Sequence, residues 1–212
     1  AIQYIISIHI PIILTVSLPL FLGWIYPDIF TPVHVIFLEL VMGPTCSIVF
    51  ENEPMEKNTM LQKPRPMTET FLNWHELGMS ILQGLMITAG VLFMYQLTLK
   101  QGGNEAQVRT MVFSTLIFAN IFLTLVNRSF YFSFVTTLRY KNNLLLGIIT
   151  ITLAILATML FVDPVAAFFQ LVHPELSDIG RCAGIAFISV FWFEAVKVWR
   201  RARNAPILER NQ

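Results

Sequence analysis

The sequence contains little charge. Asp, Glu, Lys and Arg make up 13% of its 212 residues, against about 25% in an average soluble domain. Hydrophobic residues make up 55%, and 18 of the residues are Phe. The net charge of +1 says little by itself, and we expect no nucleic-acid partner. This composition excludes an ordinary soluble domain and predicts the lipid bilayer as a partner.

Sequence motifs for catalysis and cofactor binding are missing as well. The two cysteines, Cys46 and Cys182, fall in different apolar segments and give no disulfide framework. The sequence has no Cys-x-x-Cys, no His-Glu-x-x-His and no glycine-rich loop that would cradle a phosphate. We therefore expect this chain to hold no cofactor of its own.

Long apolar runs are abundant in the sequence. Six of them are long enough to cross about 30 Å of hydrocarbon as helices. They predict an all-α polytopic membrane protein, a six-transmembrane-helix bundle with a broken second helix. The transmembrane domain is expected over residues 1–203, with a polar cytoplasmic loop over 51–75 and a cytoplasmic tail over 204–212. The predicted spans are about 3–26, 32–50, 76–99, 109–127, 143–162 and 180–198.

Basic residues are distributed unevenly between the two predicted sides of the membrane. Eleven of the 14 lie in the loops after the second and fourth spans or at the carboxyl end. Cytoplasmic segments of membrane proteins carry an excess of Lys and Arg. We therefore predict that both termini are cytoplasmic.

Glu39 lies in an otherwise apolar segment, and Gly43 and Pro44 follow it within five residues. A carboxylate in hydrocarbon is costly and usually functional. Pro44 lacks a backbone donor, and unwound backbone at membrane depth offers carbonyl oxygens that suit a cation. The segment predicts an ion site beside a helix break at Gly43 and Pro44; a kinked helix whose Glu pairs with a neighbour is the alternative. The candidate ligands here are Glu39, Val41, Met42 and Gly43.

Polar residues of two other spans are candidates for the same site. His9 lies at a suitable depth on the first span, where it is either an ion ligand or a neutral imidazole bonded to a helix carbonyl. Asn120, Thr124 and Asn127 recur at intervals of four and three residues, so they share one helix face. They are either ligands or polar contacts between helices.

The second span and the loop after it resemble part of a known family. The run from Phe30 to Pro44 is similar to the sixth transmembrane helix of cation-transporting P-type ATPases. That helix begins with a proline and runs through an apolar stretch into a polar ligand and an unwound turn. The opening residues 4–7, Tyr-Ile-Ile-Ser, resemble the family's fifth helix. The loop resembles the family's cytoplasmic loop through an acidic-Pro element, a Met and a Pro-Arg-Pro stretch, at Glu53, Pro54, Met60, Lys63, Pro64, Arg65 and Pro66.

The resemblance implies the carboxyl-terminal transmembrane region, helices five to ten, of such a pump in the plasma membrane. The chain begins inside an apolar segment without Met, so we expect a longer parent protein. The family hydrolyses ATP through a phosphorylated Asp in an Asp-Lys-Thr-Gly-type motif, which this chain lacks. Mg-ATP would be used by the missing amino-terminal and cytoplasmic domains, and this chain would carry the transported cation without hydrolysing ATP alone. The residues expected to couple the two parts are Pro54, Met60, Pro64, Arg65 and Pro66.

The chain also departs from the calcium pumps of this family. Those pumps usually carry a Glu on the fifth helix, and they carry Asn, Thr and Asp on the sixth, where this chain has Glu39, Met42 and Gly43. One carboxylate with neutral oxygens suits a singly charged ion or a proton at least as well as a divalent one. We therefore expect a calcium-pump-like class and leave the ion open. A stand-alone six-helix cation or proton transporter or channel, and a structural membrane module, are the alternatives.

The predicted topology places Gly103 and Asn58 on opposite sides of the membrane. In a background that lacks the two native cysteines, a cysteine at each position should react with an impermeant maleimide from opposite sides of sealed vesicles. Labelling of both positions from the same side would contradict the six-span topology.

Overall fold

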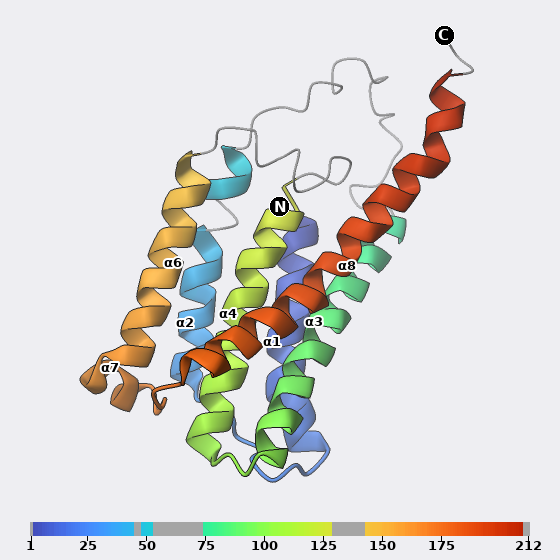
Figure 1. The fold of residues 1–212 in the computed structure, drawn as a ribbon. Helices are drawn as coiled ribbons and strands as arrows, with labels where there is room; N and C mark the ends of the chain where they lie inside the picture. The colour runs from blue at the N-terminus through green and yellow to red at the C-terminus, as the bar shows by residue number, and fades with distance from the viewer. Residues whose placement is uncertain (1, 45–47, 53–73, 129–142, 210–212) are drawn as a thin grey trace.

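The computed structural model describes residues 2–44, 48–52, 74–128 and 143–209, and these ranges contain helices, turns and connections but no strand (Figure 1). This confirms the predicted all-α bundle. The helices are α1 (Ile2–Phe21), α2 (Pro32–Pro44), α3 (Trp74–Lys100), α4 (Glu105–Val126), α6 (Asn143–Phe161), α7 (Asp163–Phe168) and α8 (Leu176–Glu209).

Five of the described helices, α1, α3, α4, α6 and α8, are long and apolar enough to cross a membrane. The helix of the second predicted span, α2, is shorter, with 13 residues. The first span also ends earlier than predicted, at Phe21 rather than at residue 26. Gly23 takes a positive φ of 60° there, and the Trp24 N–H bonds back to the Pro19 carbonyl at 2.9 Å, which turns the chain out of the helix.

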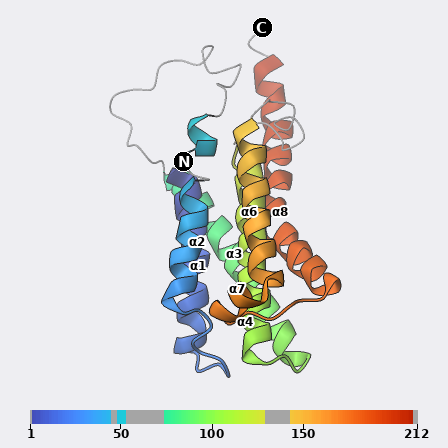
Figure 2. The ribbon, with the colours of Figure 1, turned by 90° about the vertical axis from the view of Figure 1, so that its left-hand side faces the viewer.

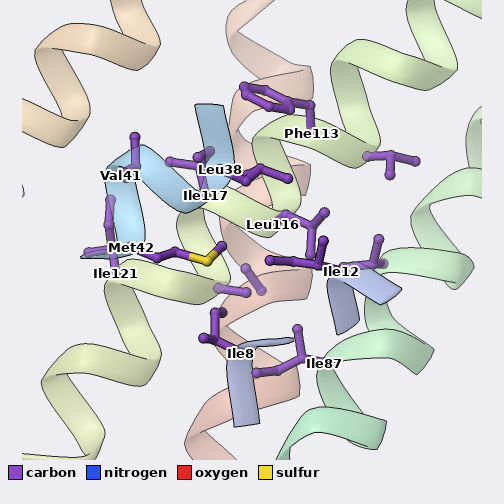
Figure 3. Packing of buried hydrophobic residues seen from close by; sticks show 14 of the residues in the cluster. Ile8, Ile12, Leu38, Val41, Met42, Ile87, Phe113, Leu116, Ile117 and Ile121 are labelled. Atoms are coloured by element: carbon purple, nitrogen blue, oxygen red, sulfur yellow. The ribbon is translucent and has the colours of Figure 1, made fainter. Parts of the chain in front are cut away.

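The central helix is α4. In its apolar window 83% of the residues are buried, against at most 39% in the other spans. Its buried side chains belong to one apolar cluster with residues of α1, α2, α3, α6 and α8, part of which Figure 3 shows. Ile8 and Ile12 come from α1, Leu38 from α2, Ile87 from α3 and Leu116 from α4. The cluster therefore connects the helix of Glu39 with the helix of His9 through α4.

Two glycines let α3 approach its neighbours closely. A Cβ at Gly84 would lie 2.7 Å from the Ile10 Cβ and 3.0 Å from the Ser7 carbonyl oxygen on α1. A Cβ at Gly90 would lie 1.9 Å from the Ser189 Oγ on α8. Small residues at helix crossings allow such contacts between membrane helices, and here they hold α3 between α1 and α8.

The first turn of α1 and the last turn of α8 lie at the same end of the bundle (Figure 1). We call this the terminal end. The turn between α3 and α4, over residues 101–104, lies at the opposite end, which we call the hairpin end, together with the connection from α1 to α2 (Figures 1 and 2). Asn104 caps α4 there in a capping box with Gln107, and Gly102 takes a φ of 82°. Residues Gly102, Gly103 and Asn104 thus form the turn between α3 and α4.

The short helix α7, which the spans predicted from the sequence do not include, lies at the hairpin end and leads into a loop that contains His173. The Nδ1 atom of His173 lies 2.5 Å from the Leu160 carbonyl oxygen, and its Nε2 atom lies 2.8 Å from Oδ1 of Asp163. Both partners accept hydrogen bonds, so the doubly protonated ring satisfies both contacts. The hydrogen bond to Asp163, and next the one to the Leu160 carbonyl, raise the pKa of His173 above its usual 6.5.

This raised pKa gives a pH dependence. Protonated His173 stabilises the fold fully below pH 6.5, its unfolded pKa, and this contribution is lost as the pH rises through the higher folded pKa. In NMR of protein with labelled histidine, the His173 signal, assigned by its loss in His173→Gln, should titrate above pH 6.5. Asp163→Asn should lower that midpoint. A midpoint that Asp163→Asn leaves unchanged would contradict the pairing.

Candidate cation site

Glu39 lies on α2, one turn before the helix ends, and its side chain contacts α1. Its Oε1 atom is 3.3 Å from Nε2 of His9, and the two side chains are 46% and 41% exposed. The two residues predicted as members of one site therefore lie next to each other. They also remain open on the side that the other described helices do not cover.

The hydrogen bond of the His9 Nδ1 atom determines the tautomer of the neutral ring, and so whether the Nε2 atom that faces Glu39 has a free lone pair. Nδ1 of His9 lies 2.7 Å from the carbonyl oxygen of Ile5, one turn earlier on α1. A carbonyl oxygen only accepts hydrogen bonds, so Nδ1 carries the proton. In the neutral ring, Nε2 is then a lone-pair donor directed at the Glu39 carboxylate.

A lone-pair nitrogen and a carboxylate oxygen repel each other at this distance unless positive charge lies between them. A proton on Nε2 supplies that charge, and so does a bound cation that both atoms contact. Two donors about 2.0–2.2 Å from a shared metal ion lie about 3.3 Å apart at a near-tetrahedral angle. The spacing of His9 and Glu39 therefore suits the binding of one positive species.

The end of α2 adds a carbonyl oxygen beside the pair. The described part of α2 extends to Pro44, and proline has no N–H, so the carbonyl of Leu40 lacks its usual donor four residues on. Residues 45–47 are outside the described ranges, and helical residues are described again from Ile48. The break predicted at Gly43 and Pro44 stays a prediction.

The other candidate residues of α2 differ from Glu39 in where their side chains lie. Val41 and Met42 are buried in the apolar cluster, and Figure 3 shows the Met42 side chain directed among apolar residues. Only their main-chain carbonyls remain candidates for an ion. Gly43 is exposed, and no atom lies within 4 Å of where its Cβ would be.

His34 holds the first turn of α2 in place. Its Nδ1 accepts a hydrogen bond from the Thr31 N–H at 3.2 Å, and its Nε2 therefore donates to the Phe169 carbonyl at 2.8 Å. The ring is 1% exposed. The sequence suggested no such contact, because Phe169 is 135 residues away along the chain.

At the hairpin end, Arg109 of α4 binds both the segment before α2 and the segment after α7. Its Nε donates to the Ile29 carbonyl at 2.7 Å, one NH group donates to the Gln170 carbonyl at 3.3 Å, and the other pairs with Glu105. Gln170 has a φ of 51°, which is unusual for a residue other than glycine. A buried guanidinium is tolerated where it is paired and bonded in this way. Together with His34, it fixes where α2 begins.

Asn120 and Thr124 belong to a hydrogen-bonded group between α1 and α4. The Tyr4 hydroxyl donates to Oδ1 of Asn120, and the Thr124 hydroxyl donates to the Asn120 carbonyl at 2.8 Å. All three residues are buried. The structure confirms that the two α4 residues share a face, and it shows them in the helix-joining role. Their role as ion ligands stays a prediction.

Asn127 belongs to a second such group, which reaches from α4 through α3 to α1. The Gln83 amide donates to Asn127 Oδ1 at 3.2 Å, and the Ser7 hydroxyl lies 3.1 Å from Gln83 Oε1 and 3.0 Å from the Ser80 carbonyl. Ser7 is two residues before His9, so this group holds the turn of α1 that carries the imidazole. Sequence reasoning identified Asn127 but not Gln83 or Ser7.

The end of α4 is also attached to α8. Lys197 donates to the Val126 carbonyl at 2.5 Å and pairs with Glu194 at 2.8 Å, while its side chain is almost fully buried. A cation at the carboxyl end of a helix interacts favourably with the helix dipole. The predicted coupling residues lie outside the described ranges: Pro54, Met60, Pro64, Arg65 and Pro66.

Comparison with known proteins identifies the class. Residues 27–199 match the family described as "Cation transporting ATPase, C-terminus". The match covers most of the chain, and the chain belongs to this family. No curated protein matches it. The protein is therefore the membrane portion of a cation-transporting ATPase, as the resemblance of the second span and its loop implied.

The Gln83 group gives a stability prediction. Gln83→Leu removes the hydrogen bond to Asn127 and one of the hydrogen-bond contacts of Ser7. It should lower the free energy of unfolding by about 0.5–2 kcal/mol, the range of hydrogen bonds between membrane helices. Thermal unfolding in detergent measures this. Gln96→Leu, at a half-buried position of the same helix, is the matched control. Equal melting temperatures for the two variants would contradict the contribution of this group.

Proposed function

We propose that this chain forms the ion pathway of an ATP-driven, calcium-pump-like cation translocase of the plasma membrane. In this proposal the terminal end of the bundle faces the cytoplasm, and Glu39 and His9 hold the transported cation together. Mg-ATP is used by the amino-terminal and cytoplasmic domains of the same pump. The observation that carries the proposal is the approach of the His9 Nε2 to the Glu39 carboxylate, at 3.3 Å, one turn before α2 ends.

Three features support a transport role for this pair over a purely structural one. Both side chains are ionisable and lie on helices of the membrane bundle, where such groups usually mark an ion pathway. Both remain more than two-fifths exposed, which a buried structural ion pair would not. The α2 end beside them offers a carbonyl whose helix donor is missing. A site open on one side is suited to completion by other parts of the pump.

The alternative of a stand-alone secondary transporter or channel uses the same two residues without ATP. Membership of the ATPase family favours the pump. In the pump, the loop over residues 51–75 would transmit the state of the cytoplasmic domains to α2 and α3, because it joins these two helices directly. A structural module would not need the exposed pair.

The test is cation transport by the full-length pump in vesicles. Glu39→Gln keeps the shape of the side chain and removes its charge, so ATP-dependent cation uptake should fall by about tenfold or more. Glu76→Gln, which neutralises an exposed Glu in the first turn of α3, is the matched control and should transport normally.

Two outcomes would count against the proposal. Normal uptake by Glu39→Gln would show that the carboxylate is a structural polar group. Uptake that continues at the same rate without ATP, and that Glu39→Gln still abolishes, would favour the secondary transporter.

A further inference from the structure

We propose that the pump selects a transition-series divalent cation, of the class of Zn²⁺ or Co²⁺, over Ca²⁺, because His9 gives the site a nitrogen donor. This inference rests on the proposed function and names the substrate class of the same site. It is carried by the orientation of the His9 ring, whose Nε2 faces Glu39 while its Nδ1 bonds to the Ile5 carbonyl.

The donor atoms differ from those that Ca²⁺ prefers. Ca²⁺ takes six to eight oxygen ligands in proteins. Imidazole nitrogen instead suits zinc, copper, iron and nickel, while carboxylate is accepted by most divalent ions. The longer bonds of Ca²⁺ also fit a separation of 3.3 Å, so the spacing alone does not separate the two classes. The nitrogen ligand separates the two classes. A calcium ion bound at this site would have an imidazole nitrogen in place of one of the oxygen ligands that it prefers.

The ring is also held in the form that a metal requires. Metal-binding histidines usually donate their second ring N–H to a carboxylate or a backbone carbonyl, which fixes the tautomer and raises ligand strength. The Nδ1 contact of His9 with Ile5, at 2.7 Å, is such a bond. The backbone of this turn is held by Ser7 through Gln83 and Ser80. The imidazole is therefore positioned before any cation arrives, which reduces the cost of binding.

The other two described histidines with printed ring contacts show what distinguishes His9. In His34 both ring nitrogens are satisfied by groups of the protein, and the ring is buried. In His173 the carboxylate oxygen is 2.8 Å from the nitrogen, a hydrogen-bonding distance, and the residue lies outside the spans. His9 combines a wider separation of 3.3 Å, an open side and a place within a membrane helix.

The experiment measures which cation stimulates ATP hydrolysis by the full-length pump in lipid vesicles, with Zn²⁺, Co²⁺ and Ca²⁺ each held at buffered free concentrations. In the wild type, the half-stimulating concentration should be at least about tenfold lower for Zn²⁺ and Co²⁺ than for Ca²⁺. His9→Gln places an amide oxygen near the position of Nε2. It should reduce this preference by about tenfold or more, the usual size of losses in metal affinity, and change the Ca²⁺ value little.

His173→Gln is the matched control, since it removes a histidine that also faces a carboxylate, and it should keep the wild-type preference. A wild type that prefers Ca²⁺ or responds only to a monovalent ion would overturn the inference, as would an unchanged preference in folded His9→Gln. If His9→Gln does not fold, the visible absorption of Co²⁺ bound to the wild type decides. A weak spectrum typical of all-oxygen, six-coordinate Co²⁺ would overturn the inference, and an intense one typical of four-coordinate Co²⁺ with a nitrogen ligand would support it.

The proposed function has a separate indicator in the same assay. Glu39→Gln should lose stimulation by all three cations. Full stimulation in Glu39→Gln would refute the site itself, whereas loss of stimulation there with an unchanged preference in His9→Gln would refute only the selectivity.

Discussion

A bilayer offers a backbone carbonyl no hydrogen-bond partner, and this constraint governs the arrangement of the whole chain. Each polar group of a spanning segment must be satisfied within the protein, so the spans are continuous helices. Even the prolines of α1 lie inside an unbroken helix, Ile2–Phe21. The described part of α2 stops at Pro44 instead, one turn after Glu39. A carbonyl without its helix donor at this depth is costly unless another group binds it, and a cation is such a group.

The fold holds the two helices of the site in different ways. The turn of α1 that carries His9 is bonded through Ser7 and Gln83 to α3, and from there to Asn127 of α4. These contacts lie close to the imidazole. At the other end of α2, His34 bonds to the loop after α7. Leu38 and Met42, close to the Glu39 end of α2, pack in the apolar cluster.

Several features could be predicted from the sequence because they depend on local patterns. The lengths of the apolar runs predicted the long helices. The early end of α1 was missed because Trp24 and Tyr26 extend the apolar run, while the turn depends on the φ of Gly23. For His9, two alternatives were left open, and the structure shows a carbonyl contact and a carboxylate contact on opposite nitrogens of one ring.

Contacts between distant segments could not be predicted, since they depend on the register of one helix against another. No pattern near His34 indicates Phe169, and no pattern near Asn127 indicates Gln83. Arg109, the first residue of the fourth predicted span, is 4% exposed, and it bonds to Ile29 and Gln170, which are distant along the chain. Only its pairing with Glu105, four residues earlier on the same helix, had a local signal.

The unequal attachment of α1 and α2 bears on how a pump could change its affinity for a cation. The distance between His9 and Glu39 depends on the positions of two helices. The turn of α1 that carries His9 is held by the hydrogen bonds of Ser7, and the part of α2 that carries Glu39 packs through Leu38 and Met42. A shift of the last turn of α2 would separate the two donors without breaking the hydrogen bonds between α1, α3 and α4. A shift of α1, in contrast, would break the hydrogen bonds of Ser7 to Gln83 and Ser80 and that of Tyr4 to Asn120 in a low-dielectric interior. A movement on the α2 side therefore leaves these buried hydrogen bonds intact, and the polar loop over residues 51–75 follows α2 in the sequence.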